Sequence, residues 1–385
     1  MTILEMEKVS LLIHGYKKDH LIINMNKCFK KLHVTRTMKS FFVCTFMLSS
    51  VSYSQSLHQF SLPVRTNIRA IAVLNDSTMW FAGSNGCFGY TEDDGKHWHI
   101  DSTKIEGLYP DFRSMSVIDQ QTVLLLNAGS PAYLLKSIDQ GATWKTVYSN
   151  EKKEIFFDSM KFRDAKNGIA IGDPIDGCFT ILTTDDAGEH WKEISCDRLP
   201  QPFAGEACFA SSNTCVELIE NNFWIATGGA EARVLSSADY GITWHFTSTP
   251  FLFGTELTGI FSLDFYDRKH GIIAGGDYEN KNECLHSKAG SNNGGKSWKP
   301  VANFEMPGFC SCVQYRPFSH AKTLLIAAHP GIYISNNGGK KWEEVKEDDG
   351  KTTLENYNTL QFSPTGKVAW CAGADGKTGR ITFNK

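Results

Sequence analysis

The sequence predicts an all-β protein folded as a seven-bladed β-propeller. The first observation is an eight-residue motif, Ser/Thr-x-Asp/Asn-x-Gly-x-x-Trp, which occurs six times with its tryptophans 44–54 residues apart. A fixed period in this range is typical of repeat architectures. The second is that short apolar runs bounded by Gly, Asn and Asp precede each copy, which is the pattern of β-strands. The six copies are residues 91–98, 137–144, 184–191, 237–244, 291–298 and 335–342.

Each residue type in the motif suits a tight turn. An Asp or Asn side chain can accept hydrogen bonds from backbone N–H groups, and Gly supplies a positive φ. The Ser or Thr hydroxyl can bond back to the same turn, and Trp then opens the next strand and packs between sheets. We interpret the motif as an Asp box, the turn joining the two outer strands of a blade, and call each copy a repeat turn. We therefore expect a structural role for Asp93, Asp139, Asp186, Asp239, Asn293 and Asn337.

The N-terminal segment stands outside the repeat and has the pattern of a secretory signal peptide. Arg36 and Lys39 precede an apolar run at residues 41–48, and a small-x-small site follows at residues 52–54. The apolar run is too short to span a bilayer. A basic start, an apolar centre and a small-residue site together indicate a cleaved signal.

This pattern sets the expected boundaries and location of the protein. Cleavage is expected after Ser54, and translation is expected to start at Met38, with Met25 as the alternative. Residues 1–54 are then an extension with a signal peptide, and residues 55–385 are the propeller. We expect a secreted or periplasmic monomer with no stable membrane anchor after cleavage.

The first blade shows the order of strands that the other blades repeat. Its strands are expected at residues 68–74, 78–82, 87–91 and 98–100, with the repeat turn between the third and the fourth. The same order recurs around residues 114–148, 157–195, 206–247, 260–302 and 311–346.

The C-terminal segment predicts how the ring closes. After Trp342 there is no seventh motif, but residues 359–362, 368–371 and 380–383 still read as strands. The missing fourth strand can come from residues 57–62, so that the two chain ends pair in one blade and hide their edges. A six-bladed ring with an irregular C-terminal tail is the alternative.

Composition excludes several function classes. The net charge is −3 and 21% of residues are charged, an ordinary globular profile. With no basic stripe or RNA-binding signature, nucleic acid is not an expected partner. No histidine cluster indicates a metal site, and no cofactor is expected.

Nine of the eleven cysteines lie after residue 54, and a secreted chain can form disulfides. Among the possible pairs, we most expect a disulfide between Cys208 and Cys215.

Charged residues are predicted to gather at one end of the propeller axis, where the inner strands begin. The turns between second and third strands lie on that face, and the repeat turns lie on the opposite face. Inner strands are expected to begin at Arg69, Arg113, Asp158, Glu206, Phe261, Ser311 and Asn358, and the turns add Asp173, Arg233, Asp277 and Tyr278.

Charges crowded around one mouth must pair with one another or meet a ligand. Arginine can take a carboxylate or phosphate bidentately. We therefore expect a binding site for a protein segment or a small anionic or glycan ligand, and a ring of salt bridges is the alternative. The candidate ligand-binding residues are Arg69, Arg113, Asp158, Asp173, Glu206, Arg233, Asp277 and Tyr278.

Beyond the motif, several strings resemble a group of secreted bacterial propellers. These include the segments at residues 68–73, 80–86, 172–174, 226–230 and 275–278. The chain from about residue 57 to 385 is similar to the BNR/Asp-box propellers of the photosystem II stability/assembly factor-like family. Members of that family are often labelled oxidoreductase or glycosyl hydrolase. Cys310 stands where a basic residue is usual in the group, and two motifs carry Asn for Asp.

The resemblance implies an alternative function, a glycan-directed hydrolase of sialidase-like or other type. Its candidate catalytic carboxylates are Asp158, Asp173, Glu206 and Asp277. Sialidases also carry Asp boxes, but they have six blades and an Arg-Ile-Pro string that this sequence lacks. A fold shared with enzymes does not establish a reaction.

Overall fold

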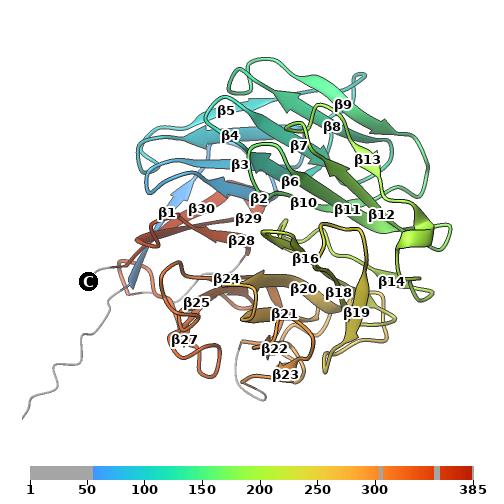
Figure 1. Ribbon diagram of the computed structural model, residues 1–385. Coiled ribbons are helices and arrows are strands. Elements are labelled where there is room, and N and C mark those ends of the chain that lie inside the picture. Colours follow the sequence, from blue (N-terminus) through green and yellow to red (C-terminus); the bar gives the residue numbers. More distant parts are fainter. Residues whose placement is uncertain (1–54, 303–306, 351–355, 384–385) are drawn as a thin grey trace, which may run out of the picture. The chain divides into compact units, whose positions relative to one another are not determined.

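Seven antiparallel sheets form the blades of a β-propeller in the computed structural model, which describes residues 55–302, 307–350 and 356–383 (Figure 1). The predicted signal peptide lies outside these residues. Within the described ranges the structure contains no α-helix, only two 3-10 helices at Cys196–Arg198 (η1) and Ala374–Gly376 (η2). No helix in these ranges is long and apolar enough to cross a membrane.

The first three blades follow the predicted order of strands. In each, the innermost strand pairs with the second, the second with the third and the third with the fourth. The first blade contains β2 (Ile68–Val73), β3 (Met79–Gly83), β4 (Cys87–Thr91) and β5 (His99–Ser102). The second contains β6 (Phe112–Val117), β7 (Val123–Asn127), β8 (Ala132–Ser137) and β9 (Lys145–Asn150). The third contains β10 (Phe157–Phe162), β11 (Gly168–Ile175), β12 (Cys178–Thr184) and β13 (Lys192–Glu193).

The fourth blade differs from the prediction. Its innermost strand begins at Val216, not at Glu206. Glu206 lies in a short strand that pairs with Gly228–Gly229, and that strand pairs in turn with the fifth blade at Gly259. A Cβ on Gly259 would lie 2.3 Å from the Cα of Gly228, so this close backbone approach requires glycine. The strands are β14 (Glu206–Ala207), β15 (Val216–Ile219), β16 (Asn222–Ala226), β17 (Gly228–Gly229), β18 (Arg233–Ser237) and β19 (His245–Ser248).

The last three blades end in the predicted closure. Strand β1 (Gln55–Ser61) pairs with β30 (Lys377–Phe383), from Gln55 opposite Phe383 to Ser61 opposite Lys377. Both chain ends therefore belong to one sheet, as predicted, and Leu57 is buried in it. The fifth blade contains β20 (Thr258–Phe265), β21 (Gly271–Asp277), β22 (Lys288–Ser291) and β23 (Lys299–Pro300). The sixth contains β24 (Cys310–Tyr315), β25 (Leu324–Ala328), β26 (Ile332–Ser335) and β27 (Glu343–Glu344). The seventh contains β28 (Tyr357–Phe362) and β29 (Val368–Gly373) together with β30 and β1.

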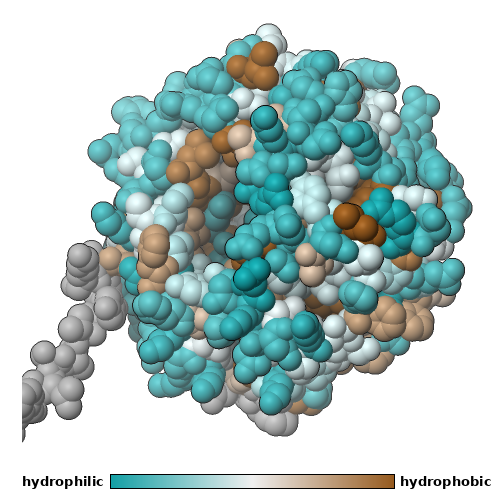
Figure 2. Space-filling model, in the orientation of Figure 1, coloured by the Kyte–Doolittle hydropathy of each residue, from teal (hydrophilic) through white to brown (hydrophobic). Residues whose placement is uncertain are grey.

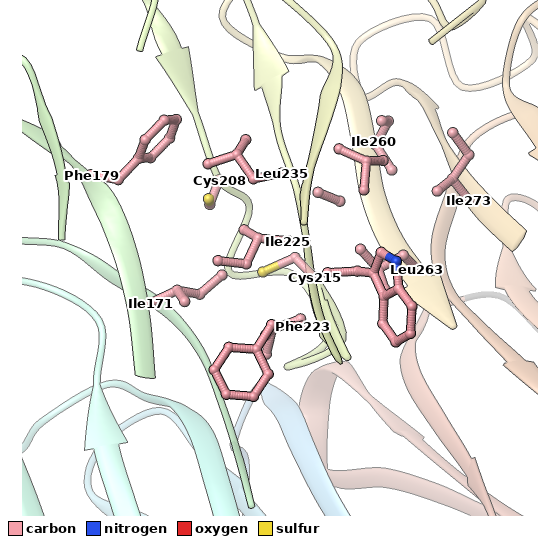
Figure 3. Close-up of a cluster of buried hydrophobic side chains, with 14 of the residues drawn as sticks. Ile171, Phe179, Cys208, Cys215, Phe223, Ile225, Leu235, Ile260, Leu263 and Ile273 are labelled. Atoms are coloured by element: carbon pink, nitrogen blue, oxygen red, sulfur yellow. The ribbon is translucent and has the colours of Figure 1, made fainter. Parts of the chain in front are cut away.

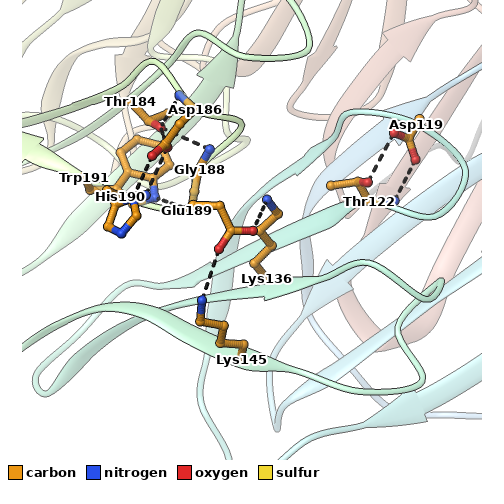
Figure 4. A network of polar contacts seen from close by, with 10 residues as sticks. All are labelled: Asp119, Thr122, Lys136, Lys145, Thr184, Asp186, Gly188, Glu189, His190 and Trp191. Atoms are coloured by element: carbon orange, nitrogen blue, oxygen red, sulfur yellow. Dashed lines mark hydrogen bonds and ion pairs between the residues drawn. The ribbon is translucent and has the colours of Figure 1, made fainter.

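The repeat turn at Asp186 shows how the motif works (Figure 4). The Thr184 hydroxyl donates to Asp186 Oδ1 at 2.9 Å and accepts the Gly188 N–H at 3.0 Å. Asp186 Oδ1 also accepts the His190 N–H at 3.0 Å. Equivalent bonds hold the other five turns, so the Asp or Asn side chain is committed to its own turn.

Apolar side chains from adjacent blades fill the space between sheets. Figure 3 shows the largest such cluster, where Ile171 of the third blade, Phe223 and Ile225 of the fourth and Leu263 of the fifth meet. Their burial stabilises the ring by about 25 cal/mol per Å² of apolar surface removed from water. On the face drawn in Figure 2 the surface is mostly hydrophilic, with apolar side chains around a hollow.

The disulfide expectation was wrong. Cys178 at the start of β12 is bonded to Cys196 of η1, whereas Cys208 and Cys215 are buried thiols. Cys208 and Cys215 do not face each other across a hairpin, because the chain between them leaves the blade and runs across the propeller axis. We call residues 208–214 the axial segment.

Candidate functional site

The axial segment divides the central channel into two chambers. Asn213 Nδ2 donates to the Met115 carbonyl of the second blade at 2.8 Å, and its Oδ1 accepts the Met160 N–H of the third at 2.9 Å. Ser212 Oγ donates to the Ser311 carbonyl of the sixth blade at 2.6 Å, and the Ser212 carbonyl accepts from Thr359 of the seventh. The upper chamber lies where the inner strands begin, and the lower chamber lies on the side of the repeat turns.

A polar cavity of about 210 Å³ occupies the upper chamber. Arg69 at the start of β2 lies in its wall. Its Nη1 is 3.4 Å from the Ser211 carbonyl, and its buried Nε has no hydrogen-bond partner among the described residues. Burial and next the nearby Arg113 lower the pKa of Arg69, against smaller opposing effects of Asp111 and Tyr278. Other residues in the wall are Asn67, Ser211, Tyr278, Lys281, Phe309, His329 and Asn358.

Arg113 lies beside Arg69 and retains accessible donors. Its Nε donates to Asp111 Oδ2 at 2.8 Å, while 29% of its side chain remains exposed. Its guanidinium also lies 5.6 Å from the ring centre of Phe156. Asp111 is ion-paired with Arg113 and also acts on Arg69, while Arg113 further acts on the buried Asp158. The upper mouth thus brings two arginines together around one ion-paired carboxylate.

The loop after β21 carries Tyr278 to the cavity. Asp277 Oδ1 accepts the backbone N–H groups of Glu279 and Asn280, at 2.8 and 3.0 Å, and so shapes this loop. Tyr278 is 42% exposed and stands edge-on to Phe309, with ring centres 5.4 Å apart. Lys281 Nζ lies 4.7 Å from the Tyr278 ring centre, which adds a second cation to this wall.

Two carboxyl groups lie next to the axial segment. Asp158 is fully buried, and its two oxygens make no well-formed hydrogen bond within the described structure. Burial and Asp173 raise its pKa well above the ordinary value, against smaller effects of Arg113 and the Ala210 amide. Burial also raises the pKa of Asp173 to about 6, although the Cys208 N–H donates to its Oδ1 at 2.9 Å. Both groups favour the protonated form more than free aspartate does.

Glu206 and Arg233 pair with each other away from the cavity. Arg233 Nε and Nη2 bind the two Glu206 oxygens at 2.9 and 2.5 Å, and both side chains are almost fully buried. The remaining capacity of Glu206 is used by Thr227 Oγ1 and the Phe203 N–H. The rings of Phe203 and Phe246 both pack against the Arg233 guanidinium, with its Cζ 4.6 and 4.5 Å from the respective ring centres. Both Glu206 oxygens are therefore occupied, and Nε and Nη2 of Arg233 are committed to the pair.

The structure thus separates seven of the eight predicted residues into three groups, and the eighth, Asp277, shapes the loop that carries Tyr278. Arg69, Arg113 and Tyr278 meet at the upper mouth, Asp158 and Asp173 lie beside the axial segment, and Glu206 with Arg233 forms a structural pair. The sequence interpretation missed Lys281, Phe309 and Ser211. No motif marks these residues, because they reach the mouth through a loop and through the axial segment.

Comparisons with solved structures agree with the fold. No protein family and no curated protein matches the sequence. A structure of YCF48 bound to D1 peptide is 15% identical, with a TM-score of 0.62, covering 85% of this chain and 97% of that one. YCF48 from Cyanidioschyzon merolae is 17% identical, with a TM-score of 0.59, covering 85% and 99%.

A GH74 xyloglucanase from Xanthomonas campestris is also similar in structure. It is 13% identical with a TM-score of 0.58, over 84% of this chain and 53% of the xyloglucanase. At such identities the similarity concerns the fold alone. YCF48 and a GH74 xyloglucanase thus share this propeller architecture.

Proposed function

We propose that the protein binds a segment of another protein at the upper mouth, with the C-terminal carboxylate of that segment at Arg69. The observation that carries this proposal is the buried Nε of Arg69, which has no partner in the part of the chain that the structure describes. Leaving such a donor unpaired costs about 1–3 kcal/mol. A carboxylate bound at this guanidinium would offset the positive charge of Arg69, Arg113 and Lys281.

The surroundings of the cavity support a peptide as the ligand. Exposed apolar side chains lie in the loops on the face of the propeller where the inner strands begin. They include Leu108, Tyr109, Phe253 and Leu257. Such side chains are suited to the apolar part of a peptide, whose charged end would reach the cavity. The structure of YCF48, a protein with a similar fold, has been solved with a D1 peptide bound.

A peptide-binding experiment tests this function. An array of peptides with free C-termini is screened with the wild-type protein, and the tightest binder is titrated into Arg69→Gln. We expect the affinity to fall by about tenfold or more, because a charged hydrogen bond is lost. Arg268→Gln is the control, since Arg268 is exposed in the turn after β20, on the face of the propeller opposite the upper mouth. Equal affinities of wild type and Arg69→Gln would contradict the proposal.

The alternative function is a glycan-directed hydrolase, and it now depends on Asp173. Asp158 is fully buried, Glu206 is paired, and Asp277 accepts two backbone N–H groups. Asp173, with a pKa raised to about 6, is the candidate with the protonation behaviour of a general acid. Hydrolysis of a glycan panel by wild type, abolished in Asp173→Asn, would favour this alternative over binding alone.

We also propose that the protein works in a secreted or periplasmic location, as a monomer. The signal-like pattern in residues 36–54 supports this, and so does the disulfide between Cys178 and Cys196. Disulfides persist mainly in oxidising compartments. Mass spectrometry of the exported protein checks the location: a mature N-terminus near Gln55 is expected, and a chain retaining residues 1–50 would contradict it.

A further inference from the structure

The lower chamber contains a second polar cavity that the proposed function does not use. A cavity of about 510 Å³ opens among the turns that follow the inner strands of the last three blades. A smaller cavity of about 160 Å³ lies between it and the axial segment, where Ser212, Asn213 and Thr214 form part of the wall. Lys161 and Gln314 line both cavities, so the two spaces are adjacent.

Six polar side chains occupy the same position on six inner strands of this chamber. In five of the inner strands the residue is the last but one of those paired with the second strand, and in β15 it is the residue at the equivalent position. The corresponding residue of the first blade is Ala72. The six are Ser116, Lys161, Glu217, Asp264, Gln314 and Gln361.

Two carboxyl groups and one ammonium group meet within this ring. Lys161 Nζ forms an ion pair with Glu217, whose side chain is 7% exposed. Asp264 is equally buried, and its Oδ2 accepts the Tyr315 N–H at 2.5 Å. Lys161 is the single cation among the residues lining the two cavities. When both carboxyl groups are ionised, the cluster therefore carries one more negative than positive charge.

This excess charge is costly at a buried position, and the protein has one way to remove it. Burial, and next the neighbouring Glu217, raise the pKa of Asp264 well above its ordinary value. A raised pKa favours the protonated carboxyl group of Asp264 more than in free aspartate, and a proton at this position removes the excess negative charge.

Aromatic rings stand at the open end of the same cavity. Tyr266 and Tyr315 meet edge to face with ring centres 5.9 Å apart, and Phe318 is 78% exposed. Carboxylates together with aromatic faces are the groups that proteins use for organic cations. A bound cation would take the place of the Asp264 proton beside the two carboxyl groups, which a neutral polyol cannot do. No group of three metal-ligating side chains occurs among the described residues.

We propose that the lower chamber binds an organic cation, with its ammonium or guanidinium head at Glu217 and Asp264 and its body against Tyr266, Tyr315 and Phe318. The site is independent of the proposed peptide-binding function, because the axial segment lies between the two chambers. The titratable groups that act on Asp264 are Glu217, Lys161, Tyr315 and Cys312. A cation paired with ionised Asp264 replaces its proton, so binding releases that proton to the solvent.

Calorimetric titration with cadaverine tests this proposal on the whole propeller. Titrations in two buffers of different ionisation heat should show that cation binding releases protons to the solvent. Agmatine tests a guanidinium head in place of an ammonium head. Pentane-1,5-diol, which has the same chain without charge, should not bind. Binding of the diol as tight as that of cadaverine, or binding of Ca²⁺ without binding of either amine, would overturn the proposal.

Three variants separate a binding site from a merely structural cluster. Asp264→Asn should weaken cadaverine binding by about tenfold or more and abolish proton release. Lys161→Met should tighten binding, because it removes the competing cation. Asp101→Asn, an exposed aspartate of β5, should bind as wild type does. If wild type binds no cation, or if Asp264→Asn binds as well as wild type, the cluster is structural only.

Discussion

At the scale of single residues, the environment of an arginine decides whether it can bind a ligand. Arg69 has a buried Nε without a partner in the described structure, while Arg233 is paired with Glu206 and also donates to the Gln201 carbonyl. Both appear as equivalent candidates in the sequence. The pairing of Arg233 with Glu206 could not be predicted, because 27 residues and an irregular connection separate them.

Removing Arg233 should destabilise the fold without affecting the mouth. In Arg233→Met the buried Glu206 loses its partner, which typically costs about 3–5 kcal/mol. Urea denaturation measures this loss, and peptide affinity of the folded protein should not change. A second change, Glu206→Leu, should recover part of the stability. A loss in Arg233→Met below about 1 kcal/mol would contradict a buried, mutually dependent pair.

Asp173 should make stability depend on pH. Because its pKa in the folded protein is about 6, above the ordinary 3.8, its favourable contribution is complete below the ordinary pKa and is lost as pH rises through about 6. Asp173→Asn removes this dependence. The melting temperature of the variant relative to wild type should therefore increase between about pH 4 and pH 7. A constant difference across that range would show that the carboxyl group is not perturbed.

At the scale of elements, local patterns were predictable and long-range connections were not. The six repeat turns were found because the hydrogen bonds of each turn lie within its own eight residues. The closing strand was found because an apolar segment at each chain end needed a partner. The axial segment was missed, because its stabilising bonds go to Met115, Met160, Ser311 and Thr359, which lie in four other blades.

Strand β1 should be essential for a closed ring. Deleting residues 55–61 exposes the edge of β30 and removes the buried Leu57 from the last blade. We expect a lower melting temperature and concentration-dependent aggregation, because unpaired strand edges associate. Light scattering during thermal unfolding measures both. A truncated protein that melts like the full chain and stays monomeric would show that the last blade does not need this strand.

At the scale of the whole molecule, the propeller holds two chambers of different charge. The upper mouth has arginines in excess, and the lower chamber has carboxyl groups in excess. The upper residues were predictable from the starts of the inner strands. Lys161, Glu217 and Asp264 also follow a sequence signal, since charged residues near the end of buried inner strands are unusual. The prediction did not include them because it placed functional residues only where the inner strands begin.

The central claim is that Arg69 receives a peptide carboxylate. The most direct measurement is a titration of one peptide, with a free or an amidated C-terminus, into wild type and Arg69→Gln. We predict that amidation weakens binding to wild type by about tenfold or more and has little effect on Arg69→Gln, since the two changes remove the same interaction. If amidation weakens binding equally in both proteins, or in neither, the carboxylate does not bind at Arg69 and the claim is contradicted.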